Sequence, residues 1–133
     1  MDTAVPKKIL VVDDEPDILA LVTARLVKAG YQVAVASDGL EGLDKAEKER
    51  PDLILVDISM PRMNGFQMVQ FIRADASLQE IPVIVITATR QKDEAAWREQ
   101  VGVDLFILKP FEAKELIEKV EEGLRLHRPE KAA

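Results

Sequence analysis

The stretch that most constrains the fold is a run of four apolar residues, 53–56, that ends abruptly in an acid, Asp57. A run so short and so apolar is typical of a strand buried on both faces, as in a parallel sheet covered by helices. Asp57 would then stand at the carboxyl end of a central strand, the edge of an open α/β sheet where ligands bind. Taken alone, Asp57 is as well explained as a cap of the following turn. The other strand ends in the chain decide between these two interpretations.

Four further short apolar stretches predict strands, at residues 9–12, 32–36, 83–87 and 105–108. Between and after the strands, apolar residues recur at helical spacing, and five helices are expected to begin near Pro16, Gly39, Asn64, Lys92 and Glu112. Strands that alternate with helices form parallel sheets with right-handed crossovers. The sequence therefore predicts a doubly wound, flavodoxin-like α/β fold with a five-stranded parallel sheet in the order 2-1-3-4-5 and five helices.

Polar residues stand at the end of four of the five predicted strands. Asp13 and Asp14 follow the first strand, Asp57 ends the third, Thr87 ends the fourth and Lys109 follows the fifth. Parallel strands bring their carboxyl ends to one edge, and strands one and three are neighbours in this order. We therefore expect the three acids to cluster, with the hydroxyl and the ammonium group beside them.

Such a cluster has a definite chemistry. Three carboxylates at close quarters repel one another unless a cation is present, and oxygen ligands favour Mg²⁺ or Mn²⁺. The ammonium group of Lys109 and the hydroxyl of Thr87 are suited to the oxygens of a phosphoryl group. In this setting a carboxylate can attack phosphorus and form an aspartyl phosphate, so the predicted site is one for phosphoryl transfer to Asp57.

Size and composition set further limits. The 133 residues suit one domain, which we place at residues 1–126, with residues 127–133 as a polar C-terminal tail. The chain has no cysteine, which fits a reducing cytoplasm and excludes thiolate chemistry. A net charge of −6 argues against direct binding of nucleic acid, and no apolar run is long enough to cross a membrane.

Six short motifs, in order along the chain, resemble the receiver domain of two-component response regulators, in particular the chemotaxis-regulator type. They are Val12-Asp13-Asp14-Glu15, Leu55-Val56-Asp57, Met60-Pro61-x-Met63-x-Gly65, Ile81-Pro82-Val83-Ile84, Thr87-Ala88 and Lys109-Pro110-Phe111. Each motif is weak alone, but each falls at a predicted strand or at its following loop. The resemblance covers residues 8–126.

The resemblance implies a phosphorylation-activated signalling switch that is not an enzyme in the ordinary sense. Asp57 would accept a phosphoryl group from a histidine kinase or a histidine phosphotransfer protein. Asp14 would bind Mg²⁺ directly, Asp13 mainly through water, and the backbone carbonyl of Ser59 would complete the protein ligands together with Asp57. Ser59 and Thr89 also stand where the family controls access of water to the aspartyl phosphate, and their short side chains predict slow self-dephosphorylation.

The remaining family roles concern the switch. Thr87 would bond the phosphoryl group, Lys109 would pair with it, and the Lys109–Pro110 peptide bond would be cis. Phe106, which alone would be an ordinary core or strand-surface aromatic, matches the switch aromatic of the family. Its inward turn would alter the face made by the fourth helix, the fifth strand and the fifth helix.

We place this output face at residues 91–100 and 105–124 and expect a downstream protein effector to bind there. Leu105 stands where the winged-helix transcription-factor branch is often acidic, so a monomer or weak dimer is expected rather than the salt-bridged dimer of that branch. A stand-alone receiver is expected, with a receiver cut from a longer regulator as the alternative.

Two other classes of protein fit the sequence less well. A Mg²⁺-dependent phosphatase of the aspartyl-phosphate type would have a second acid two residues after the nucleophile, where this chain has Ser59. A flavodoxin-type electron carrier would cradle phosphate in the first loop, where the acids Asp13, Asp14 and Glu15 would repel it.

Overall fold

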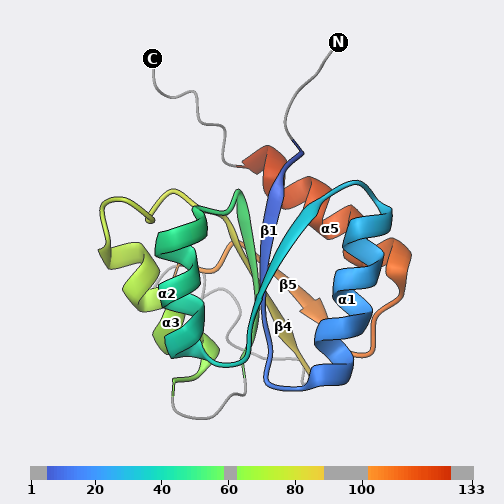
Figure 1. The fold of residues 1–133 in the computed structure, drawn as a ribbon, viewed down its shortest axis with the longest axis horizontal. Helices are drawn as coiled ribbons and strands as arrows, with labels where there is room; N and C mark the ends of the chain where they lie inside the picture. The colour runs from blue at the N-terminus through green and yellow to red at the C-terminus, as the bar shows by residue number, and fades with distance from the viewer. Residues whose placement is uncertain (1–5, 59–62, 89–101, 127–133) are drawn as a thin grey trace.

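The computed structural model describes residues 6–58, 63–88 and 102–126, and all structural statements below concern these residues. Their elements are β1 (Lys8–Val12), α1 (Pro16–Lys28), β2 (Gln32–Ala36), α2 (Gly39–Glu49), β3 (Leu53–Asp57), α3 (Gly65–Ala74), β4 (Val83–Thr87), β5 (Leu105–Leu108) and α5 (Ala113–Leu126). The five strands form one parallel sheet in the order β2-β1-β3-β4-β5, which confirms the predicted topology (Figure 1). The fourth predicted helix, at residues 92–100, lies outside the described residues.

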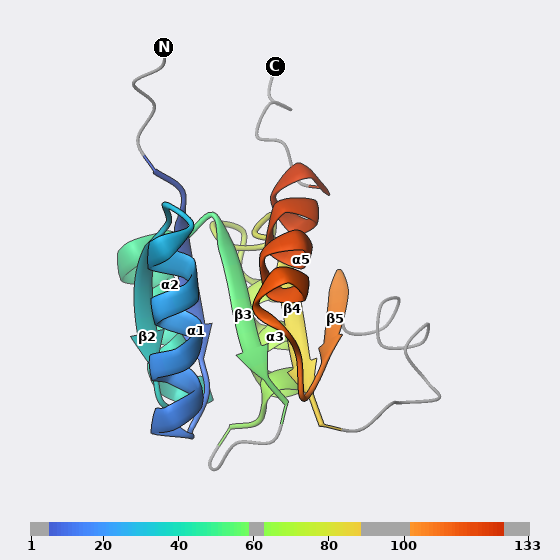
Figure 2. The same cartoon turned by 90° about the vertical axis from the view of Figure 1, so that its right-hand side faces the viewer.

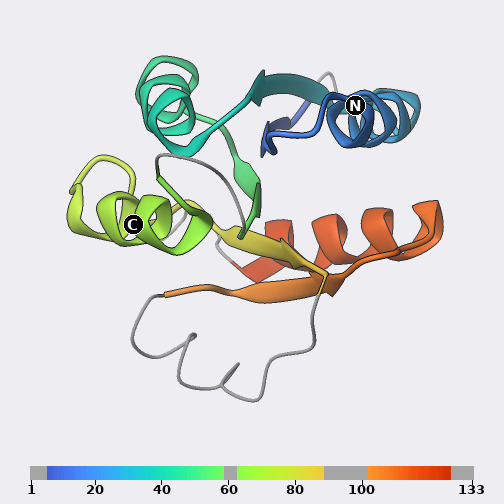
Figure 3. The same cartoon turned by 90° about the horizontal axis from the view of Figure 1, so that it is seen from below.

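The sheet is covered on both faces. Helices α1 and α5 lie on one face and α2 and α3 on the other, as the view from below shows (Figure 3). Strands β2 and β5 form the two edges (Figure 2). Every residue of β3 and β4 is buried, because alternate side chains enter the core on opposite faces of the sheet. In β3, Ile54 and Val56 belong to the core under α2 and α3, and Leu53 and Leu55 to the core under α1 and α5.

Local sequence signals fix where several helices begin or end. Pro16 is the first residue of α1, where its missing N–H costs nothing. Asn64 caps α3 through a reciprocal pair of hydrogen bonds with Gln67, at 2.9 and 3.0 Å. Gly30, with φ +100°, follows the C-cap of α1 in a conformation that favours glycine. The predicted boundaries differ from the observed ones by about one residue, as is usual for helix and strand ends.

The amino ends of β4 and β5 are joined to α3 through one guanidinium group. Arg73 donates to the carbonyl oxygens of Gly102 at 2.9 Å, Gln79 at 2.9 Å and Ile81 at 2.6 Å, and to Oδ2 of Asp104 at 2.8 Å. The same oxygen of Asp104 accepts a hydrogen bond from the backbone N–H of the first residue of β4 at 2.8 Å. This arrangement ties three segments of the chain together at the edge of the sheet opposite the predicted site.

None of the helices described is long and apolar enough to span a membrane.

Candidate functional site

The three predicted acids do meet at the carboxyl edge of the sheet. One carboxylate oxygen from each of Asp13, Asp14 and Asp57 lies within 4.8 Å of the other two. Their meeting follows from the register, because Val12 pairs with Val56 and the residue that follows each of them in the chain is an acid. Asp13 and Asp57 are buried, with 1% and 6% of their surface exposed, whereas Asp14 is exposed. A divalent ion could therefore enter this cluster from solvent on the side of Asp14, while Asp13 and Asp57 would contact it from inside the protein.

Lys109 brings the positive charge into this cluster. Its Nζ lies 3.3 Å from Oδ1 of Asp57, 3.6 Å from Oδ2 of Asp13 and 3.6 Å from Oε1 of Glu15. The Lys109–Pro110 peptide bond is cis, as the family resemblance implies. One ammonium group faces three carboxylates here, and Asp14 is a fourth acid in the cluster, so negative charge remains in excess.

The excess charge and the burial show in the ionisation of these groups. Burial, followed by the neighbouring charge of Asp13, raises the pKa of Asp57 to about 6. Burial also raises the pKa of Asp13 above its ordinary value. For Lys109, burial acts to lower the pKa, but the carboxylates of Asp13 and Asp57 outweigh it and raise the pKa. Both buried acids would therefore gain from a cation placed beside them.

The donor set fits a hard divalent cation. Among the described residues, Oδ2 of Asp13 is buried and has no hydrogen-bond partner, and it lies 3.6 Å from Nζ of Lys109, which it shares with Asp57 and Glu15. Its other oxygen, Oδ1, accepts a hydrogen bond from the backbone N–H of Glu15 at 2.9 Å. A buried carboxylate oxygen with no hydrogen bond is costly unless a charge or an ion compensates it. Asp13, Asp14 and Asp57 could therefore hold Mg²⁺ or Mn²⁺ through carboxylate oxygens alone.

Thr87 and Phe106 lie on one face of the sheet, on adjacent strands. Thr87, 3% exposed, pairs with Leu108, and its carbonyl oxygen accepts a hydrogen bond from the backbone N–H of Lys109 at 2.7 Å. Phe106 pairs with Val85, two residues before that point, and packs against the core under α2 and α3. The hydroxyl-bearing residue at the site and the predicted switch aromatic are thus connected through one ladder of strand pairs.

Some predicted residues fall beyond this description, and one contact was not foreseen. Ser59, Thr89 and the 91–100 part of the output face lie outside the described residues. The sequence assigns Glu15 no role in the cluster, yet its carboxylate lies within ion-pair distance of Lys109. The only signal for it was its place as the third acid in a row after the first strand.

An apolar cavity of about 450 Å³ opens beside the ammonium group. It is lined by Ile18, Leu21, Ala88, Lys109, Pro110 and Phe111. Leu21 on α1 is 43% exposed and contributes apolar surface to the wall of this cavity. The carboxylate cluster is therefore flanked by a surface suited to apolar side chains of another molecule.

A buried acid at the centre of a parallel sheet, with two more acids and a lysine beside it, is the pattern of a phosphoryl-accepting regulatory domain. The family model for the response regulator receiver domain matches residues 9–121. The chain therefore belongs to the receiver domains of two-component response regulators. Domains of this family are signalling switches that take phosphoryl groups from histidine kinases.

Individual relatives agree with this assignment. Protein PilH of Pseudomonas aeruginosa is 37% identical over 113 residues, which cover 85% of this chain and 93% of PilH. The alkaline phosphatase synthesis transcriptional regulatory protein PhoP of Bacillus subtilis is 39% identical over 119 residues, covering 90% of this chain but 49% of PhoP. This chain thus spans nearly all of one relative and about half the length of another.

Solved structures share the fold. The chemotaxis protein CheY4 of Vibrio cholerae superposes with a TM-score of 0.85 at 33% identity, covering 90% of this chain and 99% of that one. The receiver domain of the sensor histidine kinase PA1611 from Pseudomonas aeruginosa gives a TM-score of 0.80 at 30% identity, covering 91% and 99%. That second structure contains a magnesium ion coordinated in its active-site cleft.

Proposed function

We propose that Asp57 is the phosphoacceptor of this receiver domain and that Asp13, Asp14 and Asp57 hold the Mg²⁺ that the reaction needs. The observation that supports this most strongly is the meeting of a buried acid, two further acids and the Lys109 ammonium group at one sheet edge. Ser59 would add its backbone carbonyl, as the family resemblance implies. When bound, the metal would neutralise charge on the transferred phosphoryl group.

The transfer itself needs little from the protein beyond position and charge. A carboxylate oxygen of Asp57 forms a bond to phosphorus while the bond from phosphorus to a histidine nitrogen of the donor breaks. The electron pair of that bond returns to the imidazole ring. The Nζ of Lys109, 3.3 Å from Oδ1 of Asp57, is placed to pair with a phosphoryl oxygen, and the Thr87 hydroxyl would donate to another.

The donor's approach has a candidate surface in the cavity beside Lys109. Its floor is apolar and it borders the site directly, so an apolar patch on the donor could pack there while its histidine reaches Asp57. Leu21 and Ile18 present this surface from α1 and Pro110 presents it from the loop after β5. We therefore propose that a histidine kinase or a histidine phosphotransfer protein docks across α1 and this loop, in the cytoplasm.

The response would pass from the site to a downstream protein effector. Thr87 and Phe106 are linked by the pairing of β4 with β5. A shift of Thr87 toward the new phosphoryl oxygens would therefore alter the surroundings of Phe106. This is a population shift whose size is set by the different contacts of the two states. We propose that the effector binds the output face, residues 91–100 and 105–124, to a protein that is a monomer or a weak dimer.

The experiment that tests the function is incubation with acetyl phosphate and Mg²⁺ followed by intact-mass measurement. Wild-type protein should gain the mass of one phosphoryl group, and Asp57→Asn should gain none. Omission of Mg²⁺ should prevent the gain. An equal gain in Asp57→Asn would show that the acceptor is another residue and would contradict the proposal.

A further inference from the structure

The first residue of α2 lies in close contact with Met63, which belongs to the connection between β3 and α3. Gly39, the first residue of α2, is buried, and a Cβ built on it would lie 2.5 Å from the carbonyl oxygen of Met63. It would also lie 2.8 Å from both Cβ and Cγ of Met63. Real side chains do not approach so closely, so any residue other than glycine at position 39 would displace Met63 or the helix.

A second close contact follows two residues further along the same connection. A Cβ built on Gly65 would lie 2.5 Å from the carbonyl oxygen of Asp57 and 3.0 Å from the Cα of Ile58. The backbone N–H of Gly65 also donates to the carbonyl oxygen of Ile58 at 3.0 Å. Residues 63–65 are therefore held between α2 on one side and the end of β3, which carries Asp57, on the other.

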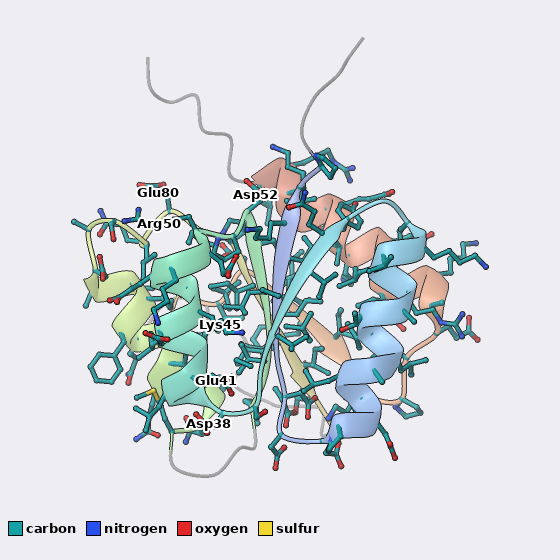
Figure 4. All side chains as sticks on the ribbon, in the orientation of Figure 1. Asp38, Glu41, Lys45, Arg50, Asp52 and Glu80 are labelled. Carbon is teal, nitrogen blue, oxygen red and sulfur yellow. The ribbon has the colours of Figure 1, made fainter. Side chains whose placement is uncertain are left out.

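The start of α2 is itself firmly anchored. Asp38 is 8% exposed and its Oδ1 accepts a hydrogen bond from the backbone N–H of Glu41 at 2.9 Å. Both residues lie at the end of α2 that is level with the carboxyl ends of the strands (Figure 4). The strand that leads into α2 is tied to the site, because the backbone N–H of Asp13 donates to the carbonyl oxygen of Ala36 at 3.1 Å. Because these hydrogen bonds hold the start of α2, a side chain added at position 39 would displace residues 63–65 and not the helix.

We propose that Gly39 is a positioning residue of the metal and phosphoryl site. By lacking a side chain, it lets residues 63–65 pack back on Asp57 and so sets the position of the Asp57 carboxylate relative to Asp13 and Asp14. Gly39 supplies no ligand atom, and its effect on metal affinity is transmitted through Met63 and Gly65. This inference rests on the proposed function, in which these acids hold Mg²⁺.

The test compares Gly39→Ala with Gly42→Ala, which adds the same methyl group to the same helix. A Cβ built on Gly42 would meet Sδ and Cε of Met68 at 2.9 and 3.0 Å, the far end of a flexible side chain, and Cγ2 of Val12 at 3.1 Å, a contact that needs an adjustment of only a few tenths of an ångström. No backbone atom is among these nearest contacts, in contrast to Gly39. The dissociation constant for Mg²⁺ is measured by calorimetry, and circular dichroism confirms that each variant is folded. We expect Gly39→Ala to weaken Mg²⁺ binding about tenfold, as loss of a support behind a metal ligand does, and Gly42→Ala to bind as the wild type does.

A folded Gly39→Ala protein with the wild-type Mg²⁺ affinity would overturn the inference, and so would an equal loss in both variants, which would assign the effect to helix packing. Wild-type protein that binds no Mg²⁺ would overturn the proposed function and this inference with it. If Gly39→Ala does not fold, Met63→Gly changes the same contact from its other side. It should also weaken Mg²⁺ binding, and an unchanged affinity there would overturn the inference.

Discussion

Lys109 and Asp57 are 52 positions apart in the sequence, yet Nζ of the lysine lies 3.3 Å from Oδ1 of the aspartate. Asp57 ends β3 and Lys109 follows β5, and these two strands are separated in the sheet by β4. The ammonium group therefore reaches across the end of β4 to meet the acid. This relationship places the one lysine of the described site where both the free carboxylate and an attached phosphoryl group need a positive charge.

Replacement of Lys109 should separate metal binding from phosphoryl transfer. In Lys109→Met the charge that pairs with the phosphoryl oxygens is gone, so the rate of modification by acetyl phosphate should fall about a hundredfold. Mg²⁺ should still bind, because the three acids remain. Time-resolved intact-mass measurement gives the rate and calorimetry gives the Mg²⁺ affinity. Lys114→Met, on the exposed surface of α5, is the matched control, and an equal loss of rate in both variants would contradict the assignment.

The raised pKa of Asp57 predicts a pH-dependent stability. Burial raises this pKa from 3.8 to about 6, so the folded state binds a proton more tightly than the unfolded state does. The protonated carboxyl group of Asp57 therefore favours the folded state. This contribution to the free energy of unfolding is fully present below the unfolded-state pKa and is lost as the pH rises through about 6. In metal-free buffer, Asp57→Asn should therefore unfold with a higher free energy than the wild type near neutral pH, by up to about 3 kcal/mol.

Urea unfolding in the presence of a chelator measures this difference across the pH range. The advantage of Asp57→Asn should disappear in acid, where the wild-type carboxyl group is protonated in both the folded and the unfolded state. Asp44→Asn is the control, because Asp44 pairs with Lys48 on the exposed surface of α2 and such pairs contribute little. An Asp57→Asn protein no more stable than the wild type at neutral pH would contradict the prediction.

The strand ladder between Thr87 and Phe106 predicts which substitution uncouples the switch. Beryllofluoride with Mg²⁺ should shift the backbone amide resonances of Phe106 and Leu108 in the wild type. In Thr87→Ala the ligand should still bind at Asp57, but these two shifts should be lost or much reduced. Two-dimensional NMR of labelled protein records both effects. Thr23→Ala on α1 is the control and should keep both ligand-induced shifts. If the ligand shifts the Phe106 resonance in Thr87→Ala as much as in the wild type, the signal travels by another route.

The Arg73–Asp104 pair predicts a large effect on stability far from the site. Burial, although opposed by Asp104, lowers the pKa of Arg73, and its side chain is 21% exposed. Arg73→Met would remove the ion pair between Arg73 and Asp104 and the hydrogen bonds that Arg73 donates to three backbone carbonyls. We expect the free energy of unfolding to fall by about 3 kcal/mol. Urea titration measures this fall in the free energy of unfolding. Arg25→Met, on the exposed part of α1, is the control. A similarly small fall in both variants would contradict the role of the Arg73–Asp104 pair.

Much of the fold follows from local pattern. The apolar run 53–56 predicts a strand buried on both faces because no polar side chain in it could face water. The N-cap at Asn64 and the helix start at Pro16 are likewise properties of a few adjacent residues. The meeting of Asp13, Asp14 and Asp57 also follows from sequence, because parallel strands must align their carboxyl ends.

The tertiary structure decided which atoms are paired. From the sequence alone Asp13 and Asp14 were equivalent in burial, but the fold buries the first and exposes the second. The contact of Lys109 with Glu15 and the contact of Gly39 with Met63 have no periodic signal at all. Periodicity reports which face of an element is buried, and that is a property of the sequence. Contacts between side chains and loops of distant segments depend on distances of a few ångströms, and only the packing of all the elements together sets those distances.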